Sequence, residues 1–170
     1  NLRRISAESG VSTNSIYTRF GDKSGLFSAV VKPAADGLME IYLGSISEAS
    51  VCGSANTAID MGGDGTEQVL KYIYDNLDAF RLIFCNSAGT EYEDYFDRLA
   101  ETEEKFYRDF VRKYAKEPQK ISDFFIHVVC RTGWQYVFEV VSHDIPYEEA
   151  QGFMKSIREY SFSGWKRVME

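Results

Sequence analysis

Proline, cysteine and long hydrophobic runs are all scarce in this chain of 170 residues. Three prolines and 13 glycines exclude collagen-like and proline-rich classes. The three cysteines, Cys52, Cys85 and Cys130, are odd in number and widely spaced, and they contain no CxxC pair. Neither a disulfide framework nor a zinc site is therefore indicated. The longest apolar stretch, 124–130, is far shorter than the roughly 18 residues that a membrane-spanning helix needs.

The residues that are present favour a folded helical protein. Hydrophobic residues make up 44% of the chain and aromatic residues 15%, which is enough to build a core and excludes general disorder. Apolar residues recur at spacings of three and four, and no segment shows the alternation that is typical of strands. The sequence therefore predicts an all-α, soluble, cytoplasmic protein with no membrane partner.

Charge is divided unevenly along the chain. Residues 1–32 carry five basic and two acidic side chains, a net charge of +3, whereas the remainder carries 14 basic and 24 acidic ones, a net charge of −10. The whole chain, at −7, is a poor partner for nucleic acid. Attraction to phosphates is local and screened within about 10 Å, so the first 32 residues can still approach DNA end-on.

Capping residues and apolar spacing divide the chain into helices. Gly10 ends the first helix, Ser12 and Asp22 precede the next two, and Pro33 is expected to kink the third. The acidic residues of 91–104 are assigned to the solvated side of a long helix, and the helix over 121–142 is apolar on most sides, which predicts burial. The glycine-rich segment 50–65 is predicted to be a loop. The expected helices are 2–9, 12–20, 23–47, 66–77, 78–86, 91–116, 121–142 and 147–169.

The first two short helices satisfy the physical requirements of a helix-turn-helix unit. Gly10 provides the tight turn, and Ile5, Val11 and Ile16 supply an apolar contact between the two helices. The second helix opens with four short polar side chains at 12–15. Such a helix can enter the major groove and present donors and acceptors to base edges.

Residues 3–27 resemble the helix-turn-helix signature of the TetR family of transcriptional regulators. The resemblance implies a DNA-binding helix-turn-helix head over 1–32 and a helical-bundle domain for effector binding and dimerisation over 33–170. The family also has a helix before this motif, so we expect a further segment upstream of Asn1. The matching positions are Ile5, Gly10, Val11, Ser12, Ile16, Tyr17, Phe20, Lys23, Leu26 and Phe27.

Three features depart from the family's pattern. Ser6 and Ser9 replace alanines but remain small, so packing is expected to survive. Gly25 is expected to weaken the first turn of the third helix by up to about 1 kcal/mol. Pro33 interrupts the helix that links the head to the body in the family.

The resemblance implies roles for particular residues of the head. The start of the second helix and Arg19 would face the bases, Tyr17 and Lys23 would hold phosphates, and the two arginines near the N-terminus would add phosphate contacts. The DNA-binding residues implied in this way are Arg3, Arg4, Ser12, Thr13, Asn14, Ser15, Tyr17, Arg19 and Lys23.

In the body, the resemblance implies an effector cavity among the aromatic residues, although a place in the core is favoured for each of them singly. A stripe on the last helix is assigned to the interface of a homodimer, and packing within one chain would use the same stripe. The assigned ligand-binding residues are Tyr72, Phe84, Tyr107, Phe110 and Trp134. The assigned interface residues are Phe153, Ile157, Tyr160, Gly164 and Val168.

Other chemistry is weakly indicated. Asp123, His127 and Cys130 fall on one helix face, where a metal site is conceivable but a core histidine beside a buried thiol is favoured. No nucleophile–base pair or phosphate loop is recognisable, so neither an enzyme nor a cofactor nor a metal is predicted. The leading hypothesis is a homodimeric repressor that a small-molecule effector releases from a palindromic duplex operator. The alternative is a helical carrier of small molecules that has lost operator recognition.

Overall fold

The computed structural model describes the backbone of residues 1–51 and 55–170 and the side chains of 1–51 and 65–170. Within these residues the chain is helical with no strand, so the prediction of an all-α protein is confirmed. The elements are α1 (Leu2–Ser9), α2 (Thr13–Phe20), α3 (Lys23–Ser50), α4 (Ala55–Asp75), α5 (Leu77–Asn86), α6 (Tyr95–Tyr114), the 3₁₀ helix η1 (Pro118–Lys120), α7 (Asp123–Ser142) and α8 (Tyr147–Met169).

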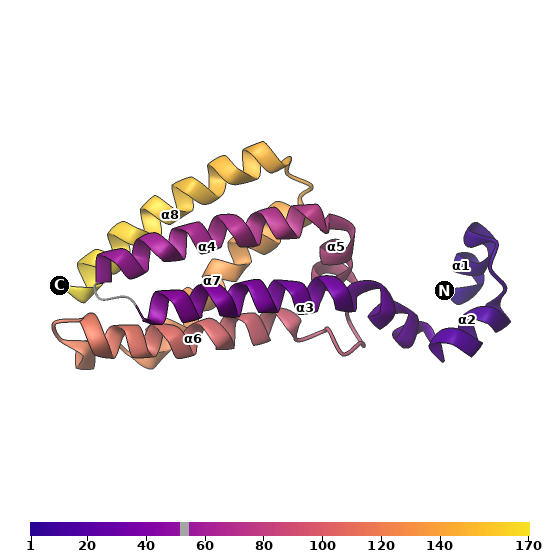
Figure 1. The fold of residues 1–170 in the computed structure, drawn as a ribbon, viewed down its shortest axis with the longest axis horizontal. Coiled ribbons are helices and arrows are strands. Elements are labelled where there is room, and N and C mark those ends of the chain that lie inside the picture. Colours follow the sequence, from indigo (N-terminus) through magenta and orange to yellow (C-terminus); the bar gives the residue numbers. More distant parts are fainter. Residues whose placement is uncertain (52–54) are drawn as a thin grey trace.

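The molecule is elongated, with α1 and α2 at one end and the C-terminus at the other (Figure 1). The two short helices pack on each other, and α2 packs on the beginning of α3. The remainder of α3 forms a bundle in which it lies against α4, while α6 pairs with α7 and α4 contacts α8. Helix α3 therefore connects the terminal pair of helices to the bundle.

Local capping chemistry places the first helix ends where the sequence predicts them. Gly10 adopts a left-handed conformation, with φ of 71°, after α1. Ser12 Oγ accepts a hydrogen bond from the Ser15 amide at 3.1 Å, and an Asp22 carboxylate oxygen accepts one from the Gly25 amide at 2.8 Å. These bonds satisfy amides that the first turn of a helix leaves unpaired.

The main core occupies the half of the bundle that is nearer to α1 and α2. Leu38, Ile73, Phe80 and Leu99, which come from four different helices, are fully buried in it. The buried Tyr95 hydroxyl donates a hydrogen bond to a backbone carbonyl oxygen of α3 at 2.7 Å. A second, smaller core joins α6, α7 and α8 around Val111, Ile126, Cys130 and Trp165.

The predicted loop over 50–65 is wrong. Helix α3 continues to Ser50 and α4 already begins at Ala55, while 52–54, which include Cys52, lie outside the described residues. Close packing of α3 on α4 explains the difference, because a Cβ atom at Gly65 would overlap the Ser45 hydroxyl of α3. A glycine that costs helix propensity thus allows the two backbones to approach each other.

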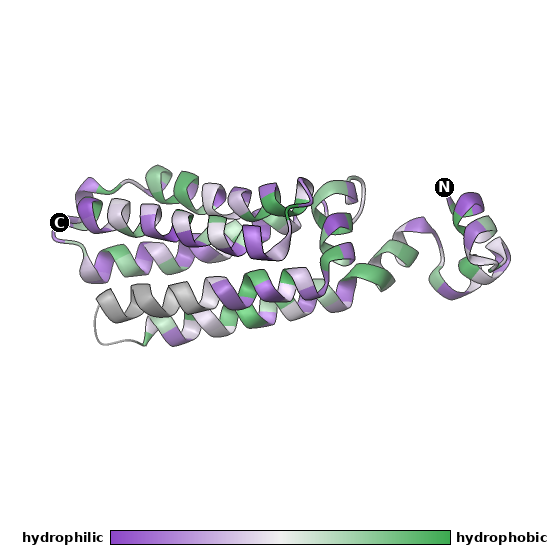
Figure 2. Ribbon diagram, turned by 90° about the horizontal axis from the view of Figure 1, so that it is seen from above, coloured by the Kyte–Doolittle hydropathy of each residue, from purple (hydrophilic) through white to green (hydrophobic). Residues whose placement is uncertain are grey.

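Two further expectations concern helix faces and curvature. The prediction that α7 is buried on most sides holds for its second half but not for its first turns, where Phe124 is 74% exposed and Val128 43% exposed. Helix α3 continues through Pro33, and Figure 1 shows it curved where it leaves the bundle toward α2. Figure 2 shows that this connecting part of α3 is largely hydrophobic.

Candidate functional site

A cavity of about 1090 Å³ lies inside the bundle, between α3, α4, α6, α7 and α8. Its α3 wall runs from Tyr42 to Ala49, which places it in the half of the bundle distant from α1 and α2. The volume lies slightly above the range of about 300–1,000 Å³ that small-molecule sites usually occupy. The cavity is therefore large enough for an organic ligand of drug-like size.

Aromatic rings form much of the cavity wall. The Tyr107 ring stacks on Trp165 with centroids 4.7 Å apart, and Phe125 meets Trp165 edge-on at 5.6 Å. Tyr42 meets Trp134 edge-on at 5.0 Å. These pairs hold the rings at fixed angles and present several aromatic faces and edges to the cavity.

One carboxyl group, that of Glu103 on α6, lies among these rings. Burial raises the pKa of Glu103 to about 8, because an apolar environment disfavours the charged form. The Tyr42 hydroxyl and the Trp134 indole N–H lie near it and act in the opposite direction on its pKa. Both of these polar atoms are buried, and neither has a hydrogen-bond partner of acceptable geometry among the described residues.

The predicted ligand-binding residues divide into two groups in the structure. Tyr107, Phe110 and Trp134 line the cavity. Tyr72 and Phe84 do not, so that part of the assignment is not supported by the geometry. The Tyr72 hydroxyl donates to the Pro33 carbonyl oxygen at 3.4 Å, and its ring packs on the core. Phe84 belongs to an aromatic cluster with three other phenylalanines at the opposite end of the bundle.

Sequence reasoning missed two polar residues of the cavity, Tyr42 and Glu103. The assignment of all the acidic residues over 91–104 to a solvated side is wrong for Glu103, which lines the cavity, and for Glu104, which is 5% exposed. A signal was available, because Glu103 precedes Phe106, Tyr107 and Phe110 by three, four and seven positions. That spacing puts the carboxyl group on the aromatic face of α6.

The stripe assigned to a dimer interface also lies partly at the cavity. Ile157, Tyr160, Gly164 and Val168 line it from α8, whereas Phe153 packs against a tyrosine ring of α7 at 6.2 Å. Several of these side chains remain open to solvent, with Tyr160 72% exposed. The stripe thus faces the cavity and the surface at the same time.

The residues assigned to DNA contact lie on the exterior of α1, α2 and the start of α3. Tyr17 is 53% exposed, while Ile16 beside it is 3% exposed and anchors α2. Of the basic residues, Arg4 forms an ion pair with Glu8 at 2.8 Å, and the Arg19 guanidinium lies 5.6 Å from a neighbouring phenylalanine ring. The remaining assigned residues are half-buried Thr13 and the exposed Arg3, Ser12, Asn14, Ser15 and Lys23.

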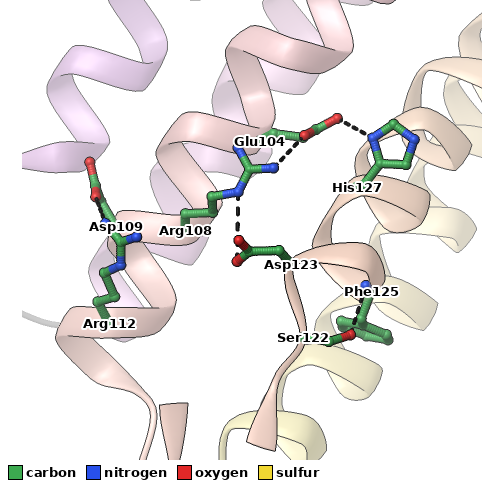
Figure 3. A network of polar contacts seen from close by, with 8 residues as sticks. All are labelled: Glu104, Arg108, Asp109, Arg112, Ser122, Asp123, Phe125 and His127. Carbon is green, nitrogen blue, oxygen red and sulfur yellow. Dashed lines mark hydrogen bonds and ion pairs between the residues drawn. The ribbon is translucent and has the colours of Figure 1, made fainter. Parts of the chain in front are cut away.

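A polar network joins α6 to α7 beside the second core (Figure 3). Buried Glu104 lies 2.8 Å from Arg108 and 2.7 Å from His127, and Arg108 lies 3.8 Å from Asp123. Asp123 and His127 therefore have protein partners, while Cys130 belongs to the second core. The described residues contain no group able to hold a metal ion, and the conceivable metal site over 123–130 does not form.

Replacing Glu104 with glutamine is expected to lower the free energy of unfolding by about 1–3 kcal/mol. The substitution removes the charge that pairs with Arg108 at 2.8 Å and leaves this partly buried cation with only the more distant and more exposed Asp123, at 3.8 Å. Urea denaturation at pH 7 measures the loss. Glu101→Gln on the exposed side of the same helix is the control and is expected to change stability by less than about 0.5 kcal/mol. Equal effects of the two substitutions would contradict a structural role for the network.

Comparison of the chain with known protein families, with curated proteins and with solved structures found no match. Among the described residues, no helix has both the length and the apolar character that crossing a bilayer requires. Function is therefore inferred from the residues and their geometry.

Proposed function

We propose that the chain is a TetR-like DNA-binding transcriptional regulator, a homodimeric repressor that a small-molecule effector releases from a palindromic operator. The observation that carries the proposal is the motif at residues 3–27, whose second helix has an anchored apolar residue, Ile16, and exposed polar neighbours. The net charge of +3 on residues 1–32 supports attraction to phosphates at this end of the molecule.

The placement of the cavity supports control of DNA binding through α3. This helix begins at Lys23, beside α2, and its other half supplies Tyr42, Ser45 and Ile46 to the cavity wall. Two heads in a dimer must meet major grooves about 34–36 Å apart, or a multiple of that spacing. An effector that prefers the conformation with a different head spacing shifts the population away from the DNA-bound state.

Replacing Tyr17 or Lys23 with alanine is expected to weaken operator binding about tenfold and to reduce its salt dependence. Each lost phosphate contact lowers the slope of log affinity against log salt by about one. The operator is first recovered from a pool of random duplexes with the full-length protein, and affinity is then measured by fluorescence anisotropy at two salt concentrations.

Lys71→Ala is the matched control, because Lys71 is also an exposed lysine, lies on α4 far from the motif along the chain, and its loss should leave the salt slope unchanged. Recovery of no palindrome, with weak binding that ignores sequence, would contradict the proposal. The cavity would then favour the alternative function, a helical carrier of small molecules.

A further inference from the structure

Glu103 differs from the other buried or half-buried acids of the bundle in its surroundings. Glu104 pairs with Arg108 and His127, and Asp97 pairs with Arg131 at 2.5 Å. No ion pair of the described residues includes Glu103, although it lies inside the cavity. A carboxylate taken out of water needs a compensating positive charge or hydrogen-bond donors.

The surroundings of Glu103 are aromatic and contain unsatisfied polar atoms. Trp134, which is 4% exposed, and Tyr42 each place a buried donor near the Glu103 carboxyl group, where both favour its charged form, but neither makes a hydrogen bond of good geometry among the described residues. Tyr107, one turn along α6 from Glu103, stacks on Trp165 of α8. Aromatic faces attract cations, most strongly where water is excluded.

We propose that the cavity binds a lipophilic organic cation, whose positive centre lies between the Glu103 carboxylate and the faces of the surrounding aromatic rings. The carboxylate supplies the counterion, the rings supply cation–π contacts and apolar area, and the volume of about 1090 Å³ accommodates bulky hydrophobic substituents. The role of this cation as the effector rests on the proposed function, whereas its binding does not.

The charges that face the cavity favour a cation over an anion. The titratable groups facing Glu103 are Tyr42 from α3, Tyr107 from α6 and Cys130 from α7, and burial raises the pKa of each, so all three are neutral at pH 7. From α8, the exposed side chains of Arg158 and Glu159, one basic and one acidic, line the cavity, and the described lining residues of α4 are uncharged. Among the described lining residues, the interior of the cavity thus holds one acid that can become negative and no buried cationic side chain beside it.

Binding of such a cation is coupled to release of a proton. In the empty cavity the raised pKa keeps Glu103 largely protonated at pH 7. A bound positive charge favours the ionised carboxylate, so the proton leaves to solvent when the cation enters. Affinity for a cation that does not itself titrate is therefore expected to rise with pH toward about pH 8, by at most about tenfold per pH unit, and then to level off.

The test compares tetraphenylphosphonium with tetraphenylborate, two probes of nearly the same shape and opposite charge. Isothermal titration calorimetry of the full-length protein without DNA is expected to show binding of the cation at least tenfold tighter than that of the anion. Glu103→Gln should weaken binding of the cation at least tenfold and should not weaken binding of the anion. It should also abolish the rise of cation affinity with pH. The control Glu101→Gln, on the exposed side of α6, should leave both affinities unchanged.

Equal affinity for the two probes, no binding of the cation, or unchanged cation binding in Glu103→Gln would each overturn the proposal. The wild-type pH dependence is a second readout that needs no variant. Because no DNA is present, a positive result stands even if the protein recognises no operator, and a negative result leaves operator binding untouched. The effector role is tested separately. The phosphonium cation should release a recovered operator from the protein, and Glu103→Gln should weaken that release.

Discussion

Replacing Phe80 with alanine is expected to lower the free energy of unfolding by about 3–5 kcal/mol, the range for deleting a buried aromatic ring. Phe80 is fully buried in α5, with ring centroids 6.1 Å from Tyr72 and 5.7 Å from Phe84. Alanine removes the ring's apolar area and leaves a void at the junction of α3, α4, α5 and α7. Urea denaturation followed by circular dichroism measures the loss.

Phe124→Ala is the matched control, since it deletes the same atoms from a side chain that is 74% exposed on α7. Its effect is expected to stay within about 0.5 kcal/mol. Comparable losses for the two substitutions would show that the main core does not carry the stability of the bundle. The comparison also separates burial from the composition of the side chain, because both positions lie within helices.

Features that depend on a few neighbouring residues are predictable from this sequence. The turn at Gly10 needs only a residue that tolerates a positive φ, and the starts of α2 and α3 need only a short polar side chain before the first turn. Ser12 and Asp22 meet that condition without any help from distant parts of the chain. The apolar spacing of α6 is similarly local, although it predicts a start at residue 91 and the helix begins at Tyr95.

Features that depend on contacts between helices are not predictable in this way. The segment 50–65 has the composition of a loop, yet α4 begins at Ala55 and packs along α3. The reason is a close approach at Gly65 and Ser45, which are 20 positions apart and belong to different helices. Local propensity opposes the helix, and packing between the two helices outweighs that preference.

The candidate site was predicted in part for the same reason. Periodicity identifies which aromatic residues face the interior, but a core and a cavity have the same pattern in sequence. Tyr72 and Phe84 therefore looked equivalent to Tyr107 and Phe110, although only the second pair lies in the half of the bundle that is hollow.

Gly25→Ala is expected to displace α1 and α2 from the start of α3 while leaving the bundle intact. The sequence alone presents Gly25 as a weak point of the helix, but in the structure a Cβ atom there would overlap the carbonyl oxygen of Phe20, the last residue of α2. The Gly25 amide also donates to Asp22 at 2.8 Å, so the turn has little freedom to adjust. Overpacking of this kind costs about 1–3 kcal/mol.

Amide hydrogen exchange measures this effect residue by residue. Exchange over 2–20 is expected to become at least tenfold faster in Gly25→Ala, with little change in α4 to α8. Gly44→Ala is the control on the same helix, because its Cβ meets no atom within 4 Å, and it is expected to stabilise α3 by about 0.5–1 kcal/mol. If the two variants showed the same exchange over 2–20, α2 would not pack against α3 as the structure describes.

If the proposed function holds, Gly25→Ala should also lose operator binding while it still binds the phosphonium cation, because the altered turn is remote from the cavity.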